Sequence, residues 1–292
     1  MRKHLEEFMR ECDYNDDDIP ELLSAYDKLK SSCPDDLSAL ISEYDKGYNI
    51  DYESALLRMK ALSEKTKIHE YTGALLLFLC YTKRLRAYYN EAGIDDEIFL
   101  SSVLDLRYKL DECKCVYGIK GSFVAKWFSG FFDLTRFALG RLQFEIVDFG
   151  LEYEKGGVKL APDSNVINVH IPRTGTPLDR ESTLESYRLA KEFFAPILGD
   201  TPAFVCSSWL LFPRHREMLK SDSNILAFMD DYELLASGEY ANYNEVWRLF
   251  DTMYDGAVSH LPADSSLRRA YVDLITSGEK TGWGKGVFLY KQ

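Results

Sequence analysis

At the centre of the chain stands Val166-Ile-Asn-Val-His-Ile-Pro-Arg-Thr-Gly-Thr-Pro-Leu-Asp179. Apolar and polar residues alternate from Ile167 to Ile171, which is typical of a strand with one face in a core. Asp179 then precedes an amphipathic stretch that ends at Leu198, and aspartate is a good helix N-cap. The sequence therefore predicts a strand, a loop and a helix in direct succession, as in an α/β domain.

The rest of the second half continues this mixture of strands and helices. We predict further strands at Arg141–Val147, Thr201–Leu211, Ile225–Met229 and Gly286–Tyr290. We predict further helices at Arg214–Leu219, Asn242–Thr252 and Leu267–Ile275.

The first half has a different pattern, because its apolar residues recur at three- and four-residue spacing. This spacing predicts helices at Pro20–Lys30, from Asp51, at Ile68–Asn90 and from Asp95, with another aromatic helix at Phe123–Phe137. We expect an α+β protein with an all-α domain at 1–118 and a mixed α/β domain at 119–292.

The composition and net charge of the chain argue against nucleic acid and membranes as partners. The chain has 292 residues, 46% of them hydrophobic, and a formal charge of −12, so it folds around a core and repels anionic surfaces. Nucleic acid and membranes are therefore poor partners. The charged start, Met1–Arg10, lacks the apolar run of a secretory signal. We expect a cytoplasmic protein, monomer or homodimer, whose scattered cysteines are reduced and which binds no metal.

A polar stripe lies along the predicted strands. One strand brings Gln143 and Glu145, the next brings Asn168 and His170, and a third brings Cys206 and Ser208 or Ser207 and Trp209. A carboxylate and an imidazole on one sheet face can share proton transfer. The alternative is the solvated face of an ordinary sheet, and the sequence does not choose between the two.

Two loops have features of ligand sites. In 172–179, Arg173, Gly175 and the start of a helix are suited to a phosphate, although an ordinary β-to-α turn gives the same pattern. In Gly282–Gly286, alternating glycines permit close approach of a ligand, or form a bend before an edge strand. Cys206, Ser207 and Ser208 lack the Gly-x-Ser-x-Gly context of a hydrolase nucleophile.

These segments resemble a bacterial family of acyltransferase-domain-containing proteins, with a helical N-terminal domain and a C-terminal domain of the GNAT (acyl-CoA N-acyltransferase) fold. The similar stretches are 140–145, 168–172, 204–211, 223–225 and 284–288, within a resemblance that covers essentially the whole chain. The resemblance implies that the strand before the long helix diverges from the next parallel strand, and that acyl group and amine meet in the gap.

The resemblance also implies roles for individual residues. The co-substrate is acyl-CoA, the acceptor is a small-molecule amine, and no metal takes part. The implied catalytic residues are Glu145, His170, Cys206 and Ser208. The implied coenzyme A contacts are Ile171, Arg173, Thr174, Gly175 and Thr176. The implied substrate contacts are Gln143, Asn168, Trp209 and Asn224.

One departure from the family pattern supports a second hypothesis. The usual loop reads Arg/Gln-x-x-Gly-x-Gly/Ala, whereas here Gly175 comes one place early and Pro177 replaces the second glycine. A GNAT-fold module that binds a ligand or partner without catalysis is therefore the alternative to an acyltransferase.

Overall fold

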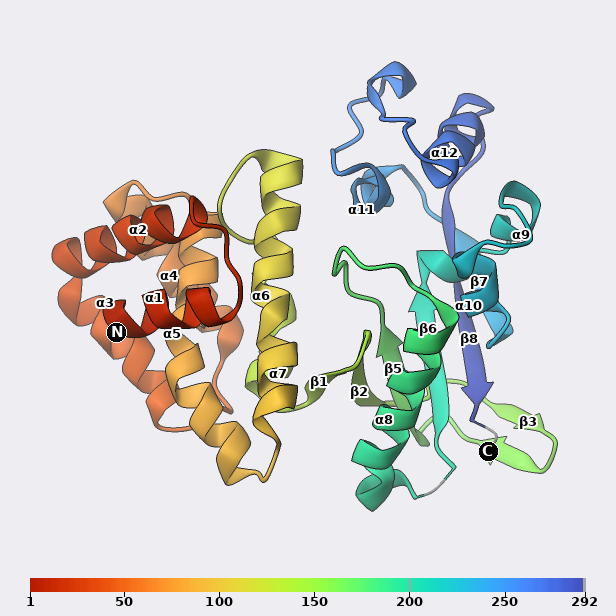
Figure 1. Cartoon of the computed structure of the whole chain (residues 1–292), viewed down its shortest axis with the longest axis horizontal. Helices are drawn as coiled ribbons and strands as arrows, with labels where there is room; N and C mark the ends of the chain where they lie inside the picture. Colours follow the sequence, from red (N-terminus) through yellow and green to blue (C-terminus); the bar gives the residue numbers. More distant parts are fainter. Residues whose placement is uncertain (200, 291–292) are drawn as a thin grey trace. The chain divides into compact units, whose positions relative to one another are not determined.

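The computed structural model describes residues 1–199 and 201–290 (Figure 1). The chain divides into two compact units, Met1–Ala138 and Leu139–Gln292. The first is helical and the second is built on a mixed sheet, which confirms the predicted α+β class.

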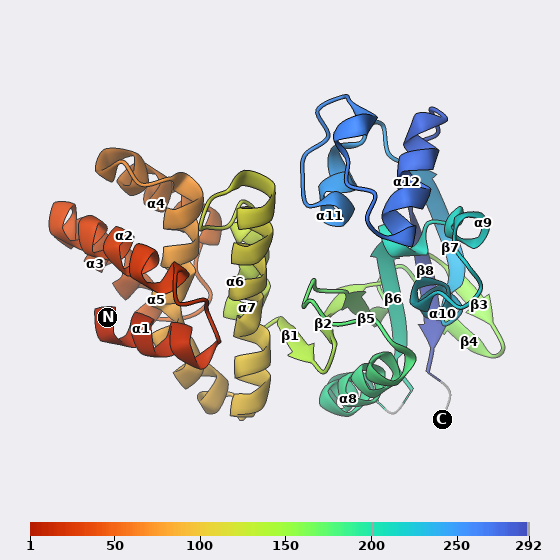
Figure 2. The ribbon, with the colours of Figure 1, turned by 45° about the horizontal axis from the view of Figure 1, so that its top comes forward.

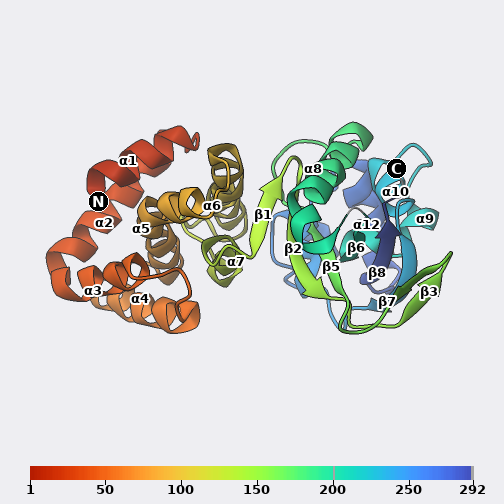
Figure 3. The same cartoon turned by 90° about the horizontal axis from the view of Figure 1, so that it is seen from below.

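The first unit is a bundle around one central helix, α5 (Glu70–Glu91). Leu75–Leu79 of α5 are completely buried, and Figure 3 shows α5 between α6 and the other helices. Within the described residues, no helix is long and apolar enough to span a membrane. The other helices of the bundle are α1 (Arg2–Glu11), α2 (Asp18–Ser32), α3 (Pro34–Asp45), α4 (Tyr52–Thr66) and α6 (Asp96–Tyr117).

The segment after α6 belongs to the helical unit, which therefore ends about twenty residues later than the predicted boundary. It forms a 3₁₀ turn η1 (Ala125–Phe128) and a short α7 (Ser129–Phe132), and not one helix over 123–137. Strand β1 (Arg136–Leu139) follows and spans the division between the two units. Tyr44 donates a hydrogen bond to the carbonyl of Phe132 over 2.8 Å, and the ring of Phe78 packs against that of Phe132. Aromatic packing thus fixes this segment in the bundle.

The second unit is built on a sheet with strand order β1-β2-β5-β6-β8-β7. The strands after β1 are β2 (Leu142–Asp148), β5 (Asn165–His170), β6 (Ala203–Ser208), β7 (Glu233–Glu239) and β8 (Gly282–Leu289), with a separate hairpin of β3 (Tyr153–Lys155) and β4 (Val158–Leu160). The helical elements are α8 (Arg180–Leu198), η2 (Trp209–Leu211), α9 (His215–Met218), α10 (Asn224–Met229), η3 (Asn244–Val246), α11 (Trp247–Phe250), η4 (Val258–His260) and α12 (Ser266–Thr276).

Helix α8 covers one face of this sheet (Figure 1). The Asp179 side chain caps it by accepting a hydrogen bond from Ser182 N over 2.9 Å, as predicted. The ring of Tyr187 on α8 packs against Phe204 and Phe288, which are registered partners on β6 and β8. Since registered residues project to the same side, these rings mark the α8 face, and side chains one position along project to the opposite face.

Two predictions for the second unit were wrong. Ile225–Met229 belongs to helix α10 and not to a strand, since Ser223 caps the helix by accepting a hydrogen bond from Ile225 N. The expected bend at Gly282–Gly286 is part of β8, which lies between β6 and β7 and is not an edge strand. The last strand of the sheet, β7, was not predicted, because Leu234-Leu-Ala236 breaks its alternation.

Candidate functional site

Strands β5 and β6 run parallel and then separate. Two registered pairs join them, Ile167 with Phe204 and Asn168 with Val205, whereas six pairs join β5 to β2. Both strands continue beyond the last pair, to His170 and Ser208. Their C-terminal ends therefore diverge, and backbone groups there do not pair between the two strands.

A cluster of polar side chains lies at this divergence, on the face opposite α8. His170 Nε2 is 2.7 Å from Glu145 Oε1, and Asn168 Nδ2 donates a hydrogen bond to the same oxygen over 3.2 Å. Gln143 is the registered partner of His170 on β2, and it is buried. The part of the predicted stripe that comes from β2 and β5 therefore gathers on one face, because these two strands are neighbours in the sheet.

The Glu145–His170 pair has the chemistry of a general base with an orienting carboxylate. An ionised carboxylate only accepts hydrogen bonds, so the short contact assigns a proton to His170 Nε2. In a neutral imidazole the lone pair then belongs to Nδ1. The side chains of His170 and Glu145 remain 22% and 16% exposed, so solvent reaches both of them.

Cys206, Asn224 and Ser208 are among the expected site residues that lie outside this cluster. Cys206 is fully buried and is two residues from Phe204, so it projects toward α8, and burial raises the pKa of its thiol. Asn224 is exposed at the start of α10, which packs against α8. Ser208 lies at the end of β6 and caps η2, because its hydroxyl accepts a hydrogen bond from Leu210 N over 3.2 Å.

Trp209 belongs to a buried aromatic cluster just beyond β6. Its ring packs edge-on against His215 and Tyr271. His215 Nδ1 contacts the carbonyl of Leu210 over 3.2 Å and its Nε2 contacts the Tyr271 hydroxyl over 2.7 Å. Because a carbonyl only accepts, Nδ1 carries the proton and Nε2 accepts from the tyrosine. Burial lowers the pKa of His215 to about 4.

This buried histidine predicts a pH-dependent stability. Between about pH 6.5 and pH 4 the unfolded chain binds a proton at His215 that the native protein does not bind. The free energy of unfolding should therefore fall by about 3 kcal/mol as the pH falls through this window. Urea unfolding at several pH values measures it, and His215→Gln should remove this contribution. If the free energy of unfolding of the variant and of the wild type depended equally on pH, this prediction would be wrong.

The loop between β5 and α8 is held by Arg141, just before β2. Its guanidinium donates hydrogen bonds to the carbonyls of Pro172, Thr176 and Pro177 over 2.9, 3.1 and 3.3 Å. These contacts turn carbonyl groups toward Arg141, and Gly175 completes the turn with a φ of +82°. The sequence predicts only that a strand begins at Arg141, and nothing in its local pattern predicts this contact with the loop.

Within the loop, the expected coenzyme A contacts already have partners of their own. Thr174 N donates to the Pro172 carbonyl over 3.1 Å, and Thr176 N donates to Thr174 Oγ1 over 3.3 Å. The guanidinium of Arg173 forms a two-pronged ion pair with Asp251, 78 residues away. Ile171 follows β5 directly and is half-buried. Nothing local in the sequence marks Asp251 as a partner of this loop.

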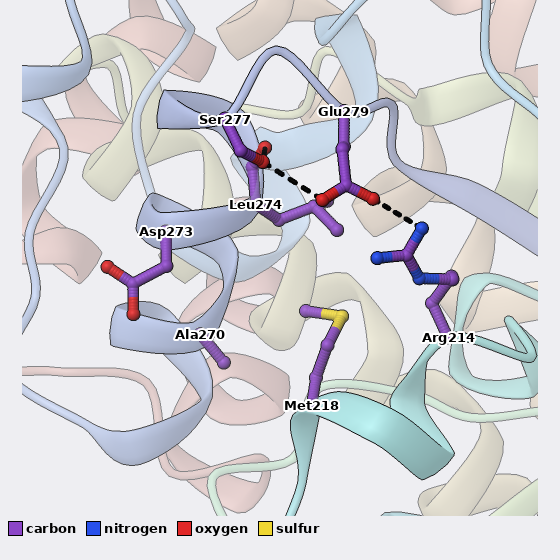
Figure 4. A pocket seen from close by; sticks show the side chains of 7 residues that line it. All are labelled: Arg214, Met218, Ala270, Asp273, Leu274, Ser277 and Glu279. Carbon is purple, nitrogen blue, oxygen red and sulfur yellow. Dashed lines mark hydrogen bonds and ion pairs between the residues drawn. The ribbon is translucent and has the colours of Figure 1, made fainter.

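A surface pocket beside α9 and α12 is lined by charged groups that satisfy one another (Figure 4). Glu279 forms an ion pair with Arg214 and accepts a hydrogen bond from the Ser277 hydroxyl over 3.0 Å. Asp273, Ala270, Leu274 and Met218 complete the lining. The Arg214–Glu279 pair neutralises itself and Asp273 leaves the lining with a net negative charge, which does not suit an anionic ligand, so we do not assign this pocket to the site.

Three or more His, Cys, Asp or Glu side chains do not gather at any point of residues 1–199 and 201–290 in a way that could hold a metal ion.

The family follows from two matches that together span nearly the whole chain. Residues 3–134 match the N-acyltransferase N-terminal domain, and residues 136–288 match the GNAT-like C-terminal domain. The chain belongs to the GNAT-like acyltransferase family. This confirms the resemblance read from the sequence, and the two matches adjoin close to the end of the helical unit.

Solved acyltransferases share the fold of this GNAT-like chain. An acyltransferase in complex with decanoyl-CoA and teicoplanin has a TM-score of 0.73 at 21% identity, over 98% of this chain and 87% of that one. An acyltransferase in complex with CoA and 10C-teicoplanin has a TM-score of 0.72 at 20% identity, with the same coverage. An acyltransferase variant bound to octanoyl-CoA covers 99% and 88% of the two chains, with a TM-score of 0.73 at 21% identity. None of the curated proteins matches the sequence.

Proposed function

We propose that this protein transfers an acyl group from acyl-CoA to an amine. The observation that carries the proposal is the divergence of β5 and β6 beside the Glu145–His170 pair. Where the parallel strands diverge, β6 no longer pairs with the backbone of β5, and we propose that the acyl group enters there. The similarity to acyltransferases crystallised with decanoyl-CoA and octanoyl-CoA supports acyl-CoA as the co-substrate.

In the proposed reaction the acceptor amine attacks the thioester carbonyl. A backbone N–H of β5 near His170 stabilises the oxyanion that develops. His170 Nδ1 accepts the amine proton, while Glu145 holds the ring by its Nε2–H and stabilises the resulting imidazolium. The carbon–sulfur bond then breaks, and the thiolate takes up one proton, so amide and free thiol form without net change in protons.

The remaining expected residues take supporting roles in this proposal. Ser208 ends β6 and has the same strand parity as Cys206, so we propose it as proton donor only for a sulfur that lies on the α8 side of the gap. We propose that Asn168, on the face of the cluster, and Trp209, directly after β6, contact the acceptor, and that the buried Gln143 supports His170 beside it. Cys206 has no part, because it is buried on the α8 side.

The loop between β5 and α8 is the proposed site of the coenzyme A phosphates. The first turn of α8 has backbone N–H groups that favour an anion, and Arg173 supplies a positive charge. Ile171, Thr174, Gly175 and Thr176 shape the loop in front of that turn. Arg141 keeps the loop in one conformation through its three carbonyl contacts.

Titration with acyl-CoA tests the proposal. Decanoyl-CoA and acetyl-CoA should bind with micromolar affinity. Arg141→Met should weaken binding about tenfold, since the loop must then be ordered on binding. Arg188→Met is the matched control, because Arg188 forms its ion pairs with Glu185 and Glu192 on the exposed side of α8. Isothermal titration calorimetry measures both. Equal affinities of the two variants would show that the loop does not hold the ligand.

A module that binds without catalysis is the second candidate. It is favoured by the loop, where Thr174 N and Thr176 N are already bonded and Pro177 has no N–H to donate. A folded protein that binds no acyl-CoA would favour such a module, and so would one that binds acyl-CoA but transfers no acyl group.

A further inference from the structure

The ion pair between Arg173 and Asp251 joins the loop before α8 to the segment that links α11 and α12. Both terminal nitrogens of Arg173 contact the carboxylate, with Nη2 3.0 Å from Oδ2. The two-pronged geometry is the one by which arginine binds a phosphate group. The Asp251 carboxylate therefore occupies the same guanidinium face that a phosphate would use.

Asp251 is held in place without Arg173. It ends α11 with a φ of +59°, and its backbone N–H donates to the Trp247 carbonyl over 2.9 Å. Arg268 of α12 binds the carboxylate, with Nη2 2.6 Å from Oδ2, and also binds the carbonyl of Leu249. Release of Arg173 would therefore leave the carboxylate with a charged partner.

Arg173 is the more exposed member of the pair. Its side chain is 44% exposed, whereas that of Asp251 is 22% exposed. Ion pairs with such exposure contribute little free energy, because water screens the charges and long side chains lose freedom. Exchange of the Asp251 carboxylate for a phosphate therefore has a small cost on the protein side.

The charges around this contact balance. Arg268 also binds both oxygens of Asp264 over 3.0 Å, so two arginines face two aspartates. An incoming phosphate thus meets a neutral group of side chains and must displace one carboxylate from Arg173. Removing the charge of Asp251 would leave a net positive charge at the loop.

We propose that Asp251 competes with the phosphates of acyl-CoA for Arg173, so that ligand binding releases the segment 251–264 from the loop before α8. This inference rests on the proposed function, since it assigns Arg173 to the ligand phosphate. It makes Asp251 a determinant of acyl-CoA affinity that does not itself touch the ligand. Figure 2 shows the α11 and α12 region to which the segment belongs.

The test compares two variants that make the same change of charge in the same segment. Asp251→Asn removes the competitor, and Asp255→Asn is the control, since Asp255 binds His260 at an exposed position. Coenzyme A and inorganic pyrophosphate are titrated into wild type and both variants. Asp251→Asn should bind both probes about fivefold more tightly, and Asp255→Asn should bind them like wild type.

Each possible result of these titrations supports or overturns the competition between Asp251 and the ligand phosphate. Equal or weaker binding by Asp251→Asn than by wild type overturns the competition while leaving the acyl-CoA site intact. An equal gain in affinity in Asp251→Asn and Asp255→Asn would show a general effect of charge and would also overturn the competition. If only Asp251→Asn binds the probes, the result supports the competition and means that Asp251 excludes the phosphate in the wild-type protein. No binding by any of the three folded proteins overturns both the competition and the acyl-CoA site.

Hydrogen exchange of the wild-type protein gives a readout that needs no variant. Coenzyme A should raise amide exchange in 251–264, because Arg173 no longer ties this segment to the loop. Exchange that falls there on ligand binding would overturn the proposal.

Discussion

Replacing His170 with asparagine should lower kcat for acyl transfer about 10²- to 10⁴-fold, the usual contribution of a general base. The imidazole takes the amine proton in the proposed reaction, and asparagine has no basic nitrogen. KM for acyl-CoA should change little, since the loop before α8 and Arg141 are untouched. Steady-state kinetics with release of the free thiol as the readout separate the two constants.

The matched control for this experiment is another histidine–carboxylate pair. His260 Nδ1 lies 2.7 Å from Asp255 Oδ2, the same separation as in the Glu145–His170 pair, but the His260 side chain is 66% exposed. His260→Asn should retain wild-type kcat. Glu145→Gln should lose part of the rate, because the amide keeps the shape and loses the charge that stabilises the imidazolium. A His170→Asn enzyme within tenfold of wild type would remove His170 from the base role.

Gly284→Ala should destabilise the second unit by about 3 kcal/mol, at the upper limit for an overpacked core. A Cβ at this position of β8 would lie 2.2 Å from the backbone oxygen of Leu211 and 2.8 Å from Leu234 Cδ1. A clash with backbone is not relieved by a rotamer change, so β8 and η2 must move apart.

Thermal unfolding measures this effect, which corresponds to a fall in Tm of about 10 °C. Gly47→Ala is the control, because a Cβ there meets no atom within 4 Å and the backbone φ is not positive. Equal midpoints for Gly284→Ala and wild type would mean that β8 does not pack on η2 as described.

Local chemistry made the helices predictable. Asp51 and Asp179 were recognised as the starts of helices, and both accept a hydrogen bond from a backbone N–H three residues later. Short apolar runs gave less information. Ile225–Met229 has a length that suits a strand or a buried helical turn, and the Ser223 cap decides for the helix.

The site was predictable only where it depends on alternation within one strand. Glu145, Asn168 and His170 were singled out from the polar side of two strands, and the pairing of β2 with β5 brings them together. No local pattern in the sequence encodes the register of β5 with β6. For this reason the sequence does not predict that Cys206 projects toward α8. The contact between Arg173 and Asp251 joins residues far apart in the chain, and no spacing rule predicts it.

Acyl transfer itself is the most direct test of the account. The full-length protein is incubated with decanoyl-CoA and a panel of amines that includes teicoplanin, and products are identified by mass spectrometry. We predict an N-acylated product together with an equal amount of free coenzyme A, both lost in His170→Asn. Tight binding of decanoyl-CoA with no acylated amine in the panel and no thiol release would contradict a catalytic role for the Glu145–His170 pair.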